Sequence, residues 1–334
     1  LDATAPTLDQ TTSAVTGNTW VVSYADMGSG FSSELPATSN FTVTVYSNAD
    51  VTKPTIVSVT SVRIDASNQQ IVLTLASAVQ SGDTVQVVYT PGSGTNLKDV
   101  AGNVLAATTF SASQVINKTA PAELLNITSM SGDSGSSATD FITNDGTSGK
   151  VVTGTISSAL RTGEVLQVSF NGGATWQTAT TNGTSWTATD SSGHTGNWTI
   201  QGKVVSSTNI NGAVATQAVL YNATLEASPT LSLTMDSGTS GDKITNSALI
   251  TTNSLLQHSN LANVTTRTYI VDGVSSSTYV APTTNGSHQV VVTDKDLAGN
   301  TVSSTLNFTL DATAPTLDQT TSAVTGNTWV VSYA

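Results

Sequence analysis

The chain has 334 residues, of which only 10% are charged, and its formal net charge is −12 from 22 acidic and 10 basic residues. This charge argues against nucleic acid and anionic membrane surfaces as partners, because phosphate binding needs clustered Lys and Arg. The chain has no cysteine, which excludes disulfides, thiolate metal sites and cysteine nucleophiles. No run approaches the roughly 18 consecutive apolar residues of a transmembrane helix, so we expect no membrane insertion.

A long internal repeat organises the sequence. Leu310 to Ala334 repeats Leu1 to Ala25 residue for residue, which gives a period of 309 residues (310 − 1). Proline-containing linkers subdivide the period, and proline ends a strand ladder because it lacks an N–H and restrains the preceding residue. The expected modules are 1–118, 119–227 and 228–313, followed by 314–334 as the truncated start of the next copy.

The predicted elements are all strands. Apolar and β-branched runs bounded by Gly, Asn, Asp and Pro indicate half-buried strands, and no segment holds a helical apolar stripe. We therefore expect an all-β chain of tandem immunoglobulin-like β-sandwich modules, stacked head to tail as a monomeric rod. In chain order the predicted strands are 41–46, 70–75, 84–89, 151–156, 165–170, 213–221, 231–235, 266–271, 289–293 and 304–310.

Two acidic loops match each other. One runs from Asp133 through Asp140 to Phe-Ile-Thr-Asn144, and the other from Asp236 through Asp242 to Lys-Ile-Thr-Asn246. In both, an Asp-Ser-Gly turn allows the second Asp to fold back toward the first. Hard divalent cations require several oxygen ligands, and calcium suits this supply better than zinc or magnesium.

An Asp before Ala-Gly-Asn is the third recurring element, and it occurs twice in the turn before the last strand of a module. In head-to-tail sandwiches this turn meets the acidic loop of the preceding module, together with the linker between them. The second-to-third junction is expected to gather Asp133, Asp140, Glu226, Asp294, Asp296 and Asn300. The third-to-next junction is expected to gather Asp236, Asp242, Asp311, which is Asp2 of the next copy, and the next equivalents of Asp99 and Asn103.

Carboxylates gathered in this way repel one another unless a cation intervenes. The sequence therefore predicts Ca²⁺ at these two junctions. The first-to-second junction has neutral Asn117 in its linker, so we expect it to bind calcium weakly or not at all. The alternative is that these residues form ordinary turns, where Asp, Gly and Asn need no metal.

These motifs resemble the bacterial immunoglobulin-like (Big) repeats of giant RTX or Bap-type surface adhesins. The first module, with TLASAVQSGDTVQVVYTPG ahead of Asp99 to Asn103, resembles the SWM-type repeat. The resemblance implies a secreted, cell-surface extender, rigidified by calcium, that holds a distal ligand-binding region away from the cell for adhesion or biofilm formation. Its partners would be neighbouring repeats, with glycans or other cells contacted through other regions. The sequence departs from the family pattern at Asn117 and Glu226, where the family has Asp.

Other functions find less support in the sequence. The three histidines are far apart, no nucleophile elbow is present, and the carboxylate motifs recur between modules, so an enzyme is not expected. A carbohydrate- or ligand-binding site in the second module is the alternative, since Trp176, Trp186, His194 and Trp198 lie there. Packing in the core is the favoured interpretation of the tryptophans, because Trp20 opens the run TWVVSY and Trp198 lies beside Ile200, although Trp176 and Trp186 flank Asn-Gly turns and fit it less well.

Overall fold

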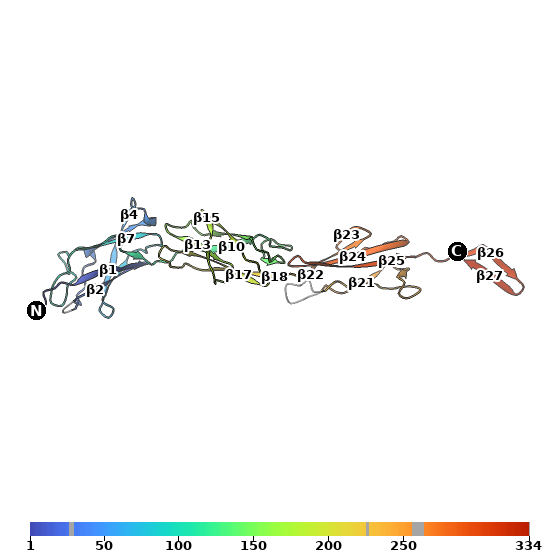
Figure 1. The fold of residues 1–334 in the computed structure, drawn as a ribbon, viewed down its shortest axis with the longest axis horizontal. Coiled ribbons are helices and arrows are strands. Elements are labelled where there is room, and N and C mark those ends of the chain that lie inside the picture. Colours follow the sequence, from blue (N-terminus) through green and yellow to red (C-terminus); the bar gives the residue numbers. More distant parts are fainter. Residues whose placement is uncertain (27–29, 225–226, 256–263, 334) are drawn as a thin grey trace. The chain divides into compact units, whose positions relative to one another are not determined.

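In a computed structural model, which describes residues 1–26, 30–224, 227–255 and 264–333, the chain consists of β-strands and two short 3-10 helices (Figure 1). The helices are η1 (Thr38–Asn40) and η2 (Ser47–Ala49). The all-β class predicted from the sequence is confirmed.

The first sandwich has two sheets, with the strand orders β5-β6-β2-β1-β9 and β4-β3-β7-β8. Buried and half-buried residues alternate along β7, because successive side chains point to opposite sides of a sheet. Trp20 and Phe110 are fully buried between the sheets, with ring centroids 5.1 Å apart in an edge-to-face arrangement. The strands are β1 (Thr7–Thr16), β2 (Thr19–Ala25), β3 (Phe41–Tyr46), β4 (Pro54–Val57), β5 (Val59–Asp65), β6 (Gln70–Leu75), β7 (Thr84–Tyr89), β8 (Thr108–Phe110) and β9 (Ile116–Asn117).

The second sandwich pairs β10-β12-β16-β15 with β11-β18-β17-β13-β14. Val152, Leu166 and Ile200 are fully buried and come from strands of both sheets. The strands are β10 (Leu125–Met130), β11 (Ile142–Thr143), β12 (Lys150–Ile156), β13 (Val165–Ser169), β14 (Gln177–Thr178), β15 (Thr180–Asn182), β16 (Ser185–Asp190), β17 (Trp198–Val205) and β18 (Ala215–Tyr221).

The third sandwich has a five-stranded sheet, β20-β25-β24-β22-β23, and a two-stranded sheet, β19-β21. Val290, Val292 and Phe308 are buried in its core. The long neighbours β24 and β25 lie side by side (Figure 1). The strands are β19 (Leu231–Leu233), β20 (Ile244–Thr245), β21 (Ile250–Thr252), β22 (Val264–Val271), β23 (Val274–Ser276), β24 (Gly286–Asp296) and β25 (Thr301–Leu310).

The last strands, β26 (Leu317–Thr325) and β27 (Thr328–Tyr333), form a two-stranded hairpin. Its register repeats that of β1 and β2, since Val324 opposes Trp329 as Val15 opposes Trp20. The burial differs, because Trp20 is fully buried whereas Trp329 is 68% exposed. Identical sequence therefore gives an identical hairpin but not an identical environment.

The predicted strands are confirmed, and those at 41–46, 70–75 and 84–89 coincide with β3, β6 and β7. The predicted module limits at 118, 227 and 313 fall in the linkers after β9, β18 and β25. By compactness the chain forms two units rather than three. The first comprises 1–131, 148–192 and 198–218, and the second comprises 132–147, 193–197 and 219–334, so the acidic loop at 132–147 belongs with the third sandwich.

Candidate metal centres at the module ends

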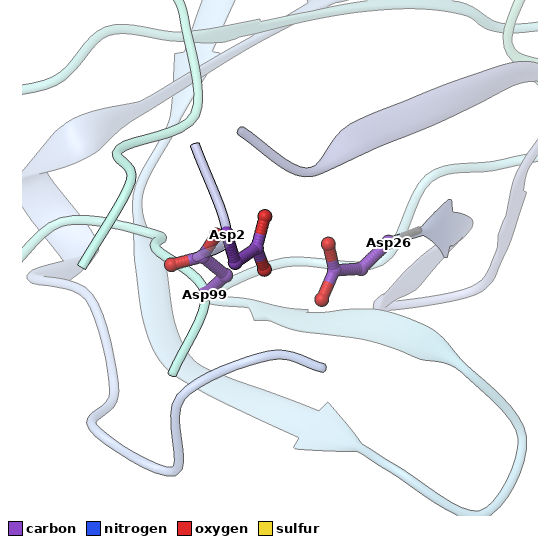
Figure 2. A group of neighbouring side chains, drawn as sticks. All are labelled: Asp2, Asp26 and Asp99. Atoms are coloured by element: carbon purple, nitrogen blue, oxygen red, sulfur yellow. The ribbon is translucent and has the colours of Figure 1, made fainter. Parts of the chain in front are cut away.

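Three carboxylates meet at the N-terminal end of the first sandwich (Figure 2). Asp2 lies in the leading segment, Asp26 follows directly after β2, and Asp99 lies in the turn before β8. One oxygen from each lies within 4.8 Å of the others, and within the described residues no other trio of acidic, His or Cys side chains meets this criterion. Asp99 is buried and the other two are half-buried.

Local turn chemistry fixes the members of this trio. Asn103 donates to both carboxylate oxygens of Asp99, from its backbone N and its Nδ2, each at 2.7 Å. The same Nδ2 lies 3.2 Å from the carbonyl of Asp2, which ties the leading segment to the turn. The Asp2 carboxylate accepts the N–H of Thr4 at 3.1 Å, an Asx turn.

The trio concentrates negative charge in a partly buried place. Two carboxylates about 4 Å apart repel by on the order of 4 kcal/mol at the effective dielectric near a protein surface. The hydrogen bonds from Asn103 stabilise Asp99 but bring no positive charge. A divalent cation would remove the repulsion, and the oxygen-only donor set is the one that calcium prefers.

The sequence predicted Asp2, Asp99 and Asn103 as members of a metal site, but not Asp26. Asp26 directly follows the repeated segment Leu1 to Ala25, whose second copy reaches Ala334, so its recurrence could not be observed. Only the antiparallel pairing of β1 with β2, which returns the chain to the same end of the sheet, brings Asp26 to Asp2.

The two acidic loops fold alike although the second is one residue shorter between its carboxylates. Asp133 Oδ2 accepts the N–H of Phe141, which follows Asp140, at 3.0 Å, whereas Asp236 Oδ2 accepts that of Gly241, which precedes Asp242, at 2.7 Å. In each loop the other oxygen, Oδ1, is buried and has no hydrogen-bond partner. Burial, helped by the nearby charge of Asp140, raises the pKa of Asp133. An unpartnered carboxylate oxygen is costly unless a cation or proton occupies it.

Backbone strain marks the same position in both loops. Phe141 and Lys243, which follow Asp140 and Asp242, both have φ of 60°. A left-handed conformation is uncommon for a bulky residue and persists only where the surroundings impose it. The strain directs the preceding carboxylates, since Asp140 Oδ1 and Asp242 Oδ1 accept the N–H groups of Ile142 and Ile244 at 3.0 and 2.9 Å.

The first acidic loop lies against the Asp-Leu-Ala-Gly-Asn turn of the third sandwich, as predicted from the head-to-tail order. Ser134 Oγ donates to the carbonyl of Ala298 at 2.6 Å, and Asn144 Nδ2 donates to Asn300 Oδ1 at 3.1 Å. A Cβ on Gly135 would lie 2.0 Å from the carbonyl oxygen of Leu297, so this approach requires glycine.

Among the described residues, the linker residue at this second junction is Asn222. Glu226 lies outside the described residues. The N–H of Asn222 donates to Thr143 O and that of Asp311 to Thr245 O, each at 2.9 Å, so these two residues occupy equivalent places. Asn222 Nδ2 and Asn300 Nδ2 each donate to Asp296 Oδ2 at 2.9 Å. Amides therefore surround the carboxylate of Asp296.

Asp294 is not gathered with these groups. It is fully buried, and its Oδ1 and Oδ2 accept Nε and Nη2 of Arg267 at 2.6 and 2.7 Å. Hydrogen bonding to Asp294 raises the pKa of Arg267 further above its ordinary value. The structure therefore places Asp294, predicted as a metal ligand, against a guanidinium that satisfies both of its oxygens.

Asp311, the equivalent of Asp2 in the next copy, makes the same Asx turn. Its Oδ1 accepts the N–H of Thr313 at 3.1 Å and Nδ2 of Asn285 at 3.2 Å. The repeated segment 310–334 contains no equivalents of Asp26, Asp99 and Asn103, so the structure places only the Asp236, Asp242 and Asp311 part of the third junction.

The aromatic residues considered for carbohydrate binding are mostly core residues. Trp186 and Trp198 are 3% and 8% exposed and pack inside the second sandwich. Trp176 is half-buried, with Lys203 Nζ 4.1 Å from the centroid of its ring. No stacking platform of several tryptophans exists among the described residues, which removes the observation that favoured a sugar site.

A profile of the SWM_repeat family, described as "Putative flagellar system-associated repeat", matches residues 1–94. No curated protein matches the chain. The described residues include no helix long and apolar enough to cross a membrane.

Several solved structures show similarity to the chain at low TM-scores. Fibronectin(III)-like modules of Clostridium thermocellum CbhA are 17% identical, with 56% of this chain and 94% of that one covered at a TM-score of 0.31. A tetra-tandem repeat from the extending region of a large adhesion protein is 17% identical, covering 93% and 74% at 0.25. A structure from a 1.5-MDa bacterial ice-binding adhesin is 15% identical, covering 91% and 96% at 0.31. At these scores the description of the fold rests on the strands and sheets given above.

Proposed function

We propose that this chain is an extender segment of a secreted bacterial surface adhesin, whose modules are held at fixed angles by calcium. The observation that carries the proposal is the convergence of Asp2, Asp26 and Asp99 at one end of the first sandwich. A soluble single domain gains nothing from placing three carboxylates together, whereas a module that must attach to the preceding one can use them to share a cation.

The third junction, between successive repeats, has the richest set of ligands. The period of 309 residues places Asp311 where Asp2 stands in the next copy, so the trio follows directly on the third sandwich. Asp236 Oδ1 is buried there without a partner, as an oxygen directed at a missing cation would be. Together the groups would supply at least four carboxylates, within the six to eight oxygens that calcium takes.

The second junction has a smaller set. Asp133 contributes an unpartnered Oδ1, and Asp140 lies beside it. Asp296 and Asn300 lie across the contact with the acidic loop, but amides already occupy Asp296. We therefore propose weaker calcium binding at the second junction than at the third.

Calcium would act by favouring the folded, stacked state. A ligand that binds only this state stabilises it in proportion to the logarithm of its concentration. Dissociation constants of about 10⁻⁴ to 10⁻³ M are typical of extracellular calcium modules. Such sites fill outside the cell and empty in the cytosol, so the chain would be looser before secretion. Adhesion itself would be performed by other regions.

Small-angle scattering and thermal melting with calcium or EDTA test this function. We expect calcium to raise the melting temperature and to narrow the range of particle dimensions. Asp26→Asn should reduce the response, whereas Asp50→Asn should not, because Asp50 is a surface carboxylate paired with Lys53. An identical melting temperature and scattering profile in calcium and EDTA would overturn the proposal.

A further inference from the structure

We infer that the junction between the first and second sandwiches is closed by the guanidinium of Arg161 in place of a metal ion, and that it keeps its geometry when calcium is withdrawn. This inference rests on the proposed function, and it specifies which junctions calcium controls. All the residues concerned lie within the first compact unit.

Arg161 projects from the second sandwich into a loop of the first. Its Nε donates to the carbonyl of Ser81 at 2.5 Å, its Nη1 to Gln80 Oε1 at 2.7 Å, and its Nη2 to Asp83 Oδ1. The guanidinium thus engages a carbonyl, an amide and a carboxylate oxygen. These are the oxygen types that a calcium ion would take at such a place.

The carboxylate that receives Arg161 is buried and held in place. The side chain of Asp83 is 6% exposed and that of Arg161 is 22% exposed. Asp83 Oδ2 accepts the N–H of Gln80 at 2.9 Å, and its Oδ1 accepts that of Asn48 at 2.8 Å. Without the guanidinium, Asp83 would be a buried charge with no counter-ion, which is strongly unfavourable.

Several neutral groups also join the two loops. Thr162 donates from its N–H to Asn48 Oδ1 at 2.6 Å and from its Oγ1 to Asn48 O at 3.0 Å. Asn117, where the linker after the third sandwich has Asp311, donates from Nδ2 to Gln80 O at 2.7 Å and Asp83 O at 3.0 Å. An aspartate at 117 would place a second carboxylate against two carbonyl oxygens. The amide of Asn117 in the linker and the guanidinium of Arg161 therefore contact the same loop of the first sandwich.

The first two sandwiches have matching loops, and the arginine stands at one of the positions where these loops differ. Residues 77–83 read SAVQSGD and residues 158–164 read SALRTGE. In both, the final carboxylate accepts the N–H three residues earlier, as Glu164 Oε2 does from Arg161 at 2.8 Å. Arg161 occupies the place of Gln80. The C-terminal end of the first sandwich is thus a surface that fits a following module whose loop carries a guanidinium.

Close approach of the two loops adds a steric requirement. A Cβ on Gly82, whose φ is +77°, would lie 2.8 Å from Cβ of Arg161. The guanidinium is attached to the chain and remains charged at all physiological pH values. Unlike a bound ion, it cannot dissociate when the surrounding solution changes. The first two sandwiches would therefore move as one body, and bending in the absence of calcium would occur at the other junctions.

The absence of cysteine allows a direct test by spin labelling of the full chain. Cysteines at the exposed positions Thr55 and Thr184 report on the first junction, and cysteines at Thr184 and Ser275 report on the second. Pulsed dipolar distances are measured in calcium and in EDTA. We expect EDTA to broaden the Thr184–Ser275 distribution and to leave the Thr55–Thr184 distribution unchanged.

Arg161→Gln provides the second arm, since glutamine retains hydrogen bonding but lacks the charge. It should broaden the Thr55–Thr184 distribution in calcium and EDTA alike, whereas Arg63→Gln, which removes an exposed pairing with Asp65, should not. Broadening of the wild-type Thr55–Thr184 distribution in EDTA, or an unchanged distribution in Arg161→Gln, would overturn the inference. If EDTA changes neither distance distribution, the proposed role of calcium is overturned. The Arg161→Gln measurement still tests whether the guanidinium holds the first junction.

Discussion

The two ends of the first sandwich meet the same electrostatic requirement in different ways. At the N-terminal end, the carboxylates of Asp2, Asp26 and Asp99 converge, with one oxygen of each within 4.8 Å of the others. At the C-terminal end, Asp83 is buried against Arg161. A module end that gathers acceptor oxygens needs positive charge, which comes either from the next module or from the solution. Only the second source makes a junction responsive to its surroundings.

The third sandwich extends this comparison to two neighbouring carboxylates. Asp294 is paired with Arg267 inside the sandwich, whereas Asp296 is surrounded by the amides of Asn222 and Asn300. A carboxylate that is paired with arginine or hydrogen-bonded by amides has fewer oxygen lone pairs left to bind a cation. The differences in charge between the junctions therefore lie in a few polar positions.

The largest expected effect is that of replacing Arg267, the basic partner of Asp294 in the third sandwich. Arg267→Met leaves Asp294 fully buried without a partner and should destabilise this sandwich by about 3–5 kcal/mol. Chemical denaturation followed by Tyr and Trp fluorescence measures the loss. Calcium should not restore the stability, and restoration by calcium would mean that Asp294 is a potential ligand after all.

Asp26→Asn should have an effect that changes sign with calcium. In EDTA it relieves carboxylate repulsion and should raise the melting temperature of the first sandwich. Wild-type protein at about 10 mM calcium should gain about 1.4–2.7 kcal/mol for dissociation constants of about 10⁻³ to 10⁻⁴ M. The variant should lose most of this gain. Equal melting temperatures for both proteins in both conditions would show that the trio does not bind calcium.

Asn222→Asp should convert the second junction to the acidic type. The substitution replaces an amide donor 2.9 Å from Asp296 Oδ2 by a carboxylate, as in the Asp311 linker. We expect a loss of about 1 kcal/mol in EDTA and a larger stabilisation by calcium than in the wild type. Isothermal titration calorimetry of the two proteins measures the change in affinity. Unchanged affinity would indicate that the linker residue is not a ligand.

The smallest expected effect depends on pH and concerns His288. Its Nδ1 lies 2.7 Å from Asp272 Oδ2 and its Nε2 lies 2.8 Å from Thr284 O, so both ring nitrogens face acceptors. The hydrogen bond to Asp272 raises the pKa of His288 above its ordinary value, and hydrogen bonds from the Gln289 N–H and from His288 lower the pKa of Asp272. This stabilisation is complete below the unfolded pKa of about 6.5 and is lost as pH rises through the folded pKa.

Melting of the protein in EDTA across this pH range measures the effect of His288. The melting temperature of the third sandwich should fall as pH rises, and His288→Gln should flatten the dependence. The positive charge of His288 belongs to a side chain, like that of Arg161, but it is lost when the imidazole is deprotonated. A wild-type profile that is flat from pH 6 to about 8 would contradict the role assigned to this pair.

Sequence reasoning was sufficient for features that depend on short stretches of chain. Alternation of apolar residues located the strands. The matching Asp-Ser-Gly segments located two loops that have a strained residue at the same position, Phe141 in one and Lys243 in the other. It was insufficient for the linker residue. The sequence did not single out Asn222, which hydrogen-bond register puts in the place of Asp311. Register is set by pairing with strands distant in the sequence, which composition does not reveal.

The 25 repeated residues separate the two kinds of information. The sequence by itself determined the hairpin and its register, since side chains alternate and the Gly-Asn turn is local. Whether its tryptophan is buried, as Trp20, or exposed, as Trp329, was decided by the presence of the remaining strands. Likewise, only packing brings Asp26 to Asp99 and Arg161 to Asp83. Burial and charge pairing depend on residues far apart in the chain, and tertiary structure alone brings them together.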